Sequence, residues 1–192
     1  MKVGVLALQG AFREHREVLE ALGVESVEVR TPEDLAGVGA LILPGGESTT
    51  MSRLLVTAEL DVPLRDRVRD GTPTLGTCAG LILLAREVLE GRPDQVSLDG
   101  IDATVRRNAY GTQVASFEAP LRIPSLGSDV FPGVFIRAPL VERVSNEVTV
   151  LAVHDDRPVL CRQGSISVST FHPELSGDLR IHQWFLASEV RQ

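Results

Sequence analysis

The sequence predicts an α/β fold: an open, mostly parallel β-sheet flanked by helices, followed by a C-terminal region of antiparallel strands. Before Gly91, short apolar runs alternate with amphipathic segments. After Gly91, short apolar runs are divided by turn residues instead. Strands separated by helices favour parallel pairing with both sheet faces covered, whereas short runs joined by tight turns favour hairpins.

The first half is expected to alternate between strands and helices. Apolar or alternating runs predict strands at 3–8, 24–29, 40–43 and 73–77. Helical periodicity predicts helices at 12–22, which Gly23 closes, and at 81–89. Another helical pattern follows the glycine-containing segment 43–50.

The second half is expected to be mainly strands until a closing helix at about 177–190. The predicted strands are 103–105, 113–117, 134–136, 148–153, 159–162 and 165–170. Gly164 allows a tight turn between the last two. We see no repeat, low-complexity tract or linker, so we expect one domain over residues 1–192.

Composition excludes several classes of function. The net charge is −7 and no basic run is longer than Arg106–Arg107, which argues against nucleic-acid binding. The N-terminal apolar run is too short for a signal peptide, and no stretch approaches the roughly 20 apolar residues of a membrane span. We therefore expect a soluble, cytoplasmic protein, in which a disulfide between Cys78 and Cys161 is improbable.

Cys78 lies in the motif Gly76-Thr77-Cys78-Ala79-Gly80, between a predicted strand and a predicted helix. This is the cysteine form of a nucleophile elbow, whose glycines permit a sharp strand-to-helix turn. Amides at the helix start favour a thiolate and can also stabilise an oxyanion. The alternative is that Cys78 is a small buried apolar residue.

A base and a group that orients it follow in Phe171-His172-Pro173-Glu174. In an extended segment, residues two apart point to one face, so Glu174 could hold the His172 imidazole. The alternative is a surface histidine beside a solvated carboxylate. The upstream cysteine motif makes that alternative less credible.

The segment 43–50 contains Gly45 and Gly46 after a predicted strand. Ligand sites in open α/β sheets lie at this strand end, so the loop can supply a second oxyanion donor. The same segment can also be interpreted as a glycine turn in which Ser48 or Thr49 caps the next helix. The two interpretations are compatible.

These motifs together resemble the class I, triad-type glutamine amidotransferases, which have a flavodoxin-like fold. More narrowly, the chain resembles the glutaminase subunits of pyridoxal 5′-phosphate synthase. The blocks that carry this resemblance are 6–15, 44–51, 76–81, 107–111, 116–118, 134–139 and 171–175. They span nearly the whole chain.

The resemblance implies a Cys78–His172–Glu174 triad that hydrolyses L-glutamine to L-glutamate and ammonia through a thioester. It implies an oxyanion hole of Gly45, Gly46 and Ala79. It implies a glutamine site of Gly46, Glu47, Ser48, Arg107, Ile136 and Arg137. Without the resemblance, Arg107 is interpreted as a solvated surface residue and Arg137 as a strand-edge residue.

The resemblance also implies a partner, the (β/α)8-barrel synthase subunit, in a large hetero-oligomer that receives the ammonia and makes pyridoxal 5′-phosphate. No cofactor or metal is expected for cysteine-based hydrolysis. Two alternatives remain: another amidotransferase or cysteine hydrolase of this fold, and a non-catalytic regulatory module.

Four further residues have no predicted part in catalysis. His15 is expected to contribute to local packing or to a partner interface. Cys161 fits the interior of a strand and is expected to be unreactive, and His154 and His182 are interpreted as structural.

Overall fold

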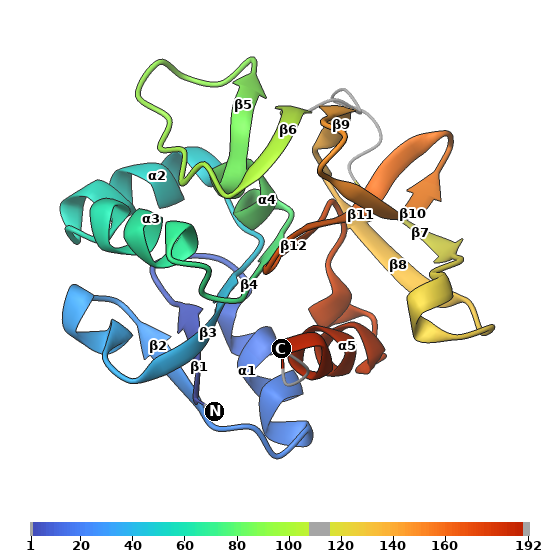
Figure 1. The fold of residues 1–192 in the computed structure, drawn as a ribbon, viewed down its shortest axis with the longest axis horizontal. Helices are drawn as coiled ribbons and strands as arrows, with labels where there is room; N and C mark the ends of the chain where they lie inside the picture. Colours follow the sequence, from blue (N-terminus) through green and yellow to red (C-terminus); the bar gives the residue numbers. More distant parts are fainter. Residues whose placement is uncertain (1, 108–115, 190–192) are drawn as a thin grey trace.

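A seven-stranded sheet forms the centre of the computed structural model, which describes residues 2–107 and 116–189 (Figure 1). The strands lie in the order β10-β11-β12-β4-β3-β1-β2. Strands β12, β4, β3, β1 and β2 pair in parallel, and β11 and β10 continue the sheet in antiparallel pairing. In chain order they are β1 (Lys2–Leu6), β2 (Ser26–Val29), β3 (Val38–Leu43), β4 (Thr74–Thr77), β10 (Thr149–His154), β11 (Arg157–Gln163) and β12 (Ile166–Ser169).

Helices cover both faces of this sheet (Figure 1). One face carries α1 (Phe12–Ala21) and α5 (Arg180–Glu189), and the other carries α2 (Ser48–Thr57), α3 (Asp61–Arg69) and α4 (Ala79–Leu84). Strand β3 shows why both faces need cover, because its apolar side chains alternate between them. Ala40 and Ile42 pack in the cluster with α1 and α5, whereas Leu41 and Leu43 pack in the cluster with α2, α3 and α4.

Two smaller sheets flank the centre. The first contains β5 (Ala85–Leu89), β6 (Ile101–Arg106) and β9 (Leu140–Val144), and the second is the antiparallel pair β7 (Ser116–Leu121) and β8 (Phe131–Ile136). Three short 3₁₀ turns complete the described part: η1 (Pro32–Leu35), η2 (Pro124–Leu126) and η3 (Pro173–Leu175). No helix in the described ranges combines the length and apolar character needed to span a bilayer.

The predicted fold class is confirmed, and the main error lies at 81–89. That segment was expected to be one helix, but α4 ends at Leu84 and β5 begins at Ala85, which pairs in parallel with Ile101. The helix is buried throughout, whereas β5 has exposed Arg86 and Glu87, and this spacing of apolar and charged residues is also compatible with a longer helix. Helix α3 and strand β9 were not predicted individually.

Other boundaries differ by smaller amounts. The expected turn at Gly164 joins β11 to β12, and the glycine has a φ of +55°. Helix α5 begins at Arg180 rather than Gly177, because the Asp178 carboxylate accepts the Arg180 amide and stops the helix from extending backwards. Residues 108–111 of the quoted family block, 113–115 of a predicted strand and Val190 lie outside the described residues.

A close backbone approach places the start of α4 against the sheet. A Cβ atom on Gly80 would lie 2.0 Å from the Leu43 carbonyl oxygen, and one on Gly76 would lie 2.9 Å from the Gly80 carbonyl. Both contacts are to backbone, which cannot swing aside as a side chain can. These two glycines therefore let the turn after β4 fold tightly over the end of β3.

We predict that Gly80→Ala lowers the free energy of unfolding by about 3 kcal/mol, the scale of an overpacked core. Gly164→Ala is the matched control, since its Cβ would meet nothing within 4 Å but would occupy a left-handed backbone. That control should cost only about 1 kcal/mol. Urea unfolding of both variants measures the difference, and equal losses would contradict the proposed collision.

Candidate active site

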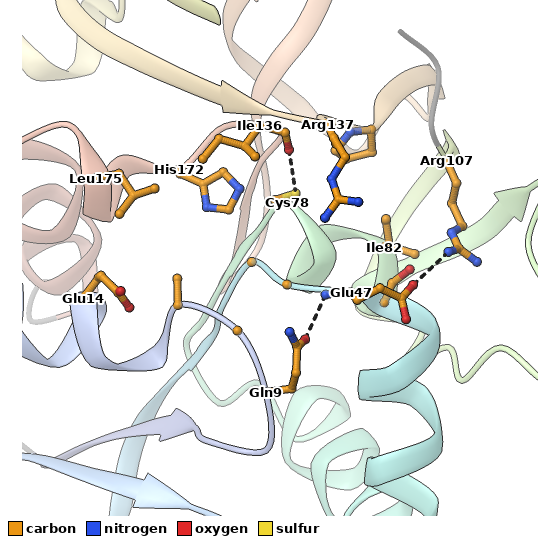
Figure 2. A pocket seen from close by; sticks show the side chains of 16 residues that line it. Gln9, Glu14, Glu47, Cys78, Ile82, Arg107, Ile136, Arg137, His172 and Leu175 are labelled. Atoms are coloured by element: carbon orange, nitrogen blue, oxygen red, sulfur yellow. Dashed lines mark hydrogen bonds and ion pairs between the residues drawn. The ribbon is translucent and has the colours of Figure 1, made fainter. Parts of the chain in front are cut away.

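A cavity of about 420 Å³ opens where β1, β3 and β4 end (Figure 2). This is the strand edge at which open α/β sheets place ligands. The predicted residues on its wall are Gly45, Gly46, Glu47, Ser48, Cys78, Arg107, Ile136, Arg137 and His172. The structure therefore brings together side chains from distant parts of the sequence.

Cys78 lies at the turn between β4 and α4. Its backbone has a φ of +48° and a ψ of −99°, a left-handed conformation that is strained for a residue with a side chain. The Cys78 amide donates to the Ser169 carbonyl at 2.9 Å, which holds the turn against β12. Its sulfur lies 3.9 Å from the Ile136 carbonyl oxygen and beside His172 (Figure 2).

Ala79 is the first residue of α4, directly after the cysteine. Cys78 provides no side-chain cap for this helix. Amides in the first turn of a helix have no partner within it, so the Ala79 N–H is available near the sulfur. The backbone is therefore compatible with the predicted role of the Ala79 N–H as an oxyanion donor.

His172 and Glu174 form a buried hydrogen bond. The His172 Nδ1 and Glu174 Oε1 atoms are 2.7 Å apart, and the Glu174 side chain is 0% exposed. The predicted contact is present, but its predicted geometry was wrong. The segment is not extended, because Pro173 begins the 3₁₀ turn η3, and this turn folds Glu174 back beneath the imidazole.

The electrostatic environment favours a charged imidazole. Burial on its own would lower the pKa of His172, but hydrogen bonds and charge from Cys78 and Glu174 outweigh burial and raise it to about 10. Burial would likewise raise the pKa of Glu174, but the neighbouring His15 and His172 outweigh it and lower that pKa. The pair is therefore suited to hold an imidazolium beside a carboxylate.

The loop at Gly45 and Gly46 fits tightly between His172 and the segment after β1. A Cβ atom on Gly45 would lie 2.2 Å from the His172 ring, and one on Gly46 would lie 2.4 Å from the Gln9 side-chain oxygen. The Gly45 carbonyl accepts the Ala11 amide at 2.9 Å. Only glycine permits this close approach at either position.

Glu47 is both a helix cap and part of an ion pair. Its carboxylate accepts the amides of Thr49 and Thr50 at the start of α2, and one oxygen lies 3.3 Å from Arg107 Nη2 (Figure 2). Partial burial would raise the pKa of Glu47, but hydrogen bonds from Thr50 and Thr49 lower it to about 2. The cap of α2 is therefore Glu47, and the expectation that Ser48 or Thr49 caps this helix is wrong.

Arg137 follows the end of β8 and points into the cavity (Figure 2). Its φ of +43° is left-handed, which is uncommon for a residue other than glycine. The predicted strand at 134–136 ends where β8 ends, so Arg137 is the first residue after the strand. The guanidinium lies toward Cys78 at the mouth of the cavity, and the residue remains exposed (Figure 2).

Sequence reasoning gave no role to several residues of this site. Gln9 accepts the Glu47 amide at 2.8 Å, and Glu14 and Leu175 also line the cavity. The signal for Gln9 was its position directly after the first strand, at the ligand-binding edge. His15 was expected in packing or a partner interface, but it is 0% exposed and contacts Glu174, so the interface part was wrong.

The second cysteine is far less suited to reaction. Cys161 is 1% exposed within β11, and burial raises its pKa to about 12. Within residues 2–107 and 116–189, no group of three or more His, Cys, Asp or Glu side chains is arranged to hold a metal ion.

Sequence comparison matches residues 5–191 to a family model described as the SNO glutamine amidotransferase family. The pyridoxal 5′-phosphate synthase subunit PdxT of Pelotomaculum thermopropionicum is 53% identical over 191 residues, which cover 100% of this chain and 96% of that protein. The protein of the same name from Herpetosiphon aurantiacus is 53% identical over 188 residues, covering 97% of this chain and 99% of that one.

Structure comparison agrees with the sequence. A crystal structure described as a glutamine amidotransferase superposes with a TM-score of 0.90 at 51% identity, covering 96% of this chain and 97% of that chain. A glutamine amidotransferase from Thermotoga maritima superposes with a TM-score of 0.61 at 13% identity, covering 99% of this chain and 83% of that chain. The second likeness concerns the fold alone.

We predict that Glu47→Ala lowers the free energy of unfolding by about 1 kcal/mol at neutral pH, the usual effect of losing a helix cap. The Glu47 pKa is lowered to about 2 from 4.5, so its stabilisation is complete above pH 4.5 and is lost as the pH falls toward 2. Urea unfolding at a series of acidic pH values measures this, with the exposed Glu20→Ala as control. An equal loss across the series would contradict the carboxylate's role.

Proposed function

We propose, because this chain belongs to the SNO glutamine amidotransferase family, that it is the glutaminase subunit of a pyridoxal 5′-phosphate synthase. Members of this family are glutamine-hydrolysing enzymes, and so is this chain. The observation that carries the proposal is the buried sequence of contacts from Cys78 through His172 to Glu174. We assign these three residues as the catalytic triad of a single domain.

In the first half-reaction, the Cys78 thiolate attacks the γ-amide carbon of L-glutamine. The carbonyl oxygen becomes an oxyanion, which then collapses as the C–N bond breaks and the His172 imidazolium protonates the leaving nitrogen. Ammonia leaves and a γ-glutamyl thioester remains. The raised pKa of His172, about 10, supports an imidazolium ready to give this proton.

In the second half-reaction, neutral His172 takes a proton from water as the water oxygen attacks the thioester carbon. The second oxyanion collapses, the C–S bond breaks, and L-glutamate and the Cys78 thiolate are released. Glu174 accepts a hydrogen bond from Nδ1 of His172 throughout, which orients the ring and stabilises its charged form. No cofactor or metal takes part.

The oxyanion in both halves is proposed to bind backbone amides of Ala79 and of the Gly45–Gly46 loop. Preorganised donors of this kind typically contribute about 3 kcal/mol each to lowering the barrier. Support comes from the position of Ala79 at the start of α4 and from the packing of Gly45 against His172.

The α-amino and α-carboxylate groups of glutamine require opposite charges, which the cavity provides. Arg107 and Arg137 are assigned to the carboxylate and Glu47 to the ammonium group, with Gly46, Ser48 and Ile136 shaping the site. The 3.3 Å ion pair between Arg107 and Glu47 holds both charges at the cavity wall.

The word "subunit" in the relatives' names implies a synthase partner. We propose that this partner is a (β/α)8-barrel subunit, that the two assemble into a large hetero-oligomer in the cytoplasm, and that ammonia passes between them through an enclosed path. An enclosed path is needed because free ammonia is protonated in neutral water and diffuses away.

Replacing Cys78 with alanine should abolish glutamine hydrolysis while leaving the fold intact. Cys161→Ala is a matched control that removes the other buried thiol, and it should keep near-normal turnover. Ammonia release measures activity, and thermal unfolding checks the fold. Turnover by Cys78→Ala close to that of the unchanged protein would refute the nucleophile assignment.

Glutamine hydrolysis by the isolated chain should be low and should rise at least tenfold when the barrel subunit is added, the change expected from completing an oxyanion site. Titrating the barrel subunit while recording ammonia release measures this dependence. Full activity in its absence would contradict the proposed coupling.

A further inference from the structure

A row of buried polar side chains continues behind Glu174. His15 Nε2 lies 3.3 Å from Glu174 Oε2 and 3.2 Å from Thr77 Oγ1. His15 Nδ1 lies 2.8 Å from His182 Nε2. His15, Thr77 and His182 are each 0% exposed. The row runs from α5 through α1 to η3 and reaches the carboxyl group whose other oxygen holds His172.

Burial favours the neutral form of both His15 and His182 by lowering the pKa of each. Burial lowers the pKa of His15, although the charges of Glu174 and Glu14 oppose it and that of His172 adds to it. Burial and His15 together lower the pKa of His182 to about 3. The titratable groups facing His15 therefore come from α1, η3 and α5, while β4 contributes only the neutral Thr77 hydroxyl.

Neutral imidazoles carry one N–H each, so the row can hold its protons in two ways. In one, His182 Nε2–H donates to His15 Nδ1, and His15 Nε2–H faces Glu174. In the other, His15 Nδ1–H donates to His182 Nε2, and His182 carries its own proton on Nδ1. The lone pair of His15 Nε2 then faces the negative Glu174 Oε2. Among the described residues, His182 Nδ1 has no hydrogen-bond partner, so the second arrangement leaves a buried donor unpaired.

The first arrangement is favoured at both ends of the row. It places the His15 Nε2–H, which lies 3.2 Å from Thr77 Oγ1, also 3.3 Å from Glu174 Oε2, a buried oxygen with no hydrogen-bond partner among the described residues. It leaves only a lone pair unpaired at His182, and an unpaired acceptor is tolerated better than an unpaired N–H. The proton order is thus fixed by the two ends and not by His15 itself.

We propose that His15 and His182 are positioning residues for the triad, in which His182 fixes the tautomer of His15 and the His15 Nε2–H holds Glu174 in place. The inference rests on the proposed triad. A neutral donor suits this task, because it satisfies the second oxygen without cancelling the negative charge that stabilises the His172 imidazolium. An imidazolium at His15 would compete with His172 for that charge.

The matched pair His15→Gln and His15→Met tests the donor. The two side chains have similar length and shape, but only glutamine places an N–H near the position of Nε2. His15→Met should lower kcat for glutamine about tenfold or more, as expected when a hydrogen bond to a charged group is lost, and should leave KM within about twofold. His15→Gln should restore kcat to within about threefold of the unchanged protein.

These rates are measured on the chain in complex with the synthase subunit, with Cys78→Ala alongside. His154→Gln is the control, because His154 packs against Phe117 and Phe135 and lies outside the row. It should leave kcat unchanged. Equal kcat for His15→Met and the unchanged protein, or equal loss in His15→Met and His15→Gln, would overturn the positioning role.

A double variant separates this role from simple packing. If His182 acts only through His15, His182→Met should slow turnover less than His15→Met, and the double variant should be no slower than His15→Met alone. If the two losses in kcat multiply in the double variant, His182 acts independently of His15, which would overturn the proposal that it acts through His15. Active Cys78→Ala would instead overturn the triad itself, so failure of the proposed function is recognisable.

Nitrogen-15 NMR of histidine in the isolated chain gives a test that needs no activity. His15 and His182 should each show the neutral Nε2–H tautomer from about pH 5.5 to about pH 8, the range in which an ordinary histidine titrates. Detection of the Nδ1–H tautomer or of an imidazolium at His15 in that range would overturn the proposed proton order.

Discussion

The ionised carboxylate of Glu174, buried from water, is the constraint around which the site is arranged. A buried charge costs several kcal/mol unless hydrogen bonds and opposite charge surround it. Glu174 meets this requirement with His172 on one oxygen and His15 against the other. Those partners come from α1 and from the residue that caps η3, so the packing of helix α1 against the sheet is tied to the state of one proposed catalytic group.

Strain at the strand ends is the second organising feature. Cys78 and Arg137 both have left-handed backbones, with φ of +48° and +43°, and both point into the same cavity. Each such conformation costs of order 1 kcal/mol or more and persists only where surrounding contacts hold it. For Cys78 these contacts are the Ser169 carbonyl and the tight packing of Gly80 on Leu43. The rigid sheet thus sustains geometry that a free loop would relax.

Much of the fold and of the site could be predicted from local patterns, and the exceptions depend on contacts between segments that are distant in the sequence. The alternation of strands and helices gave the fold class, and the glycines around Cys78 gave its turn. The end of α4 at Leu84 could not be found, because the spacing of residues 81–89 is compatible with a helix and the chain leaves it to pair β5 with β6. The contact of His15 with Glu174 also escaped prediction, since it depends on how α1 packs on η3 and not on neighbouring residues.

The charges of the cavity suit a zwitterion. Arg107 and Glu47 already neutralise one another, and Glu47 is additionally held by the start of α2. An amino acid that presents its carboxylate to the arginines and its ammonium to Glu47 adds one charge of each sign, so the net charge of the site does not change. Because the Arg107 side chain is 12% exposed and that of Glu47 43%, their pair is partly screened and weak. In the proposed binding mode, exchanging this weak pair for two pairs with glutamine therefore costs little and does not involve the buried His172–Glu174 contact.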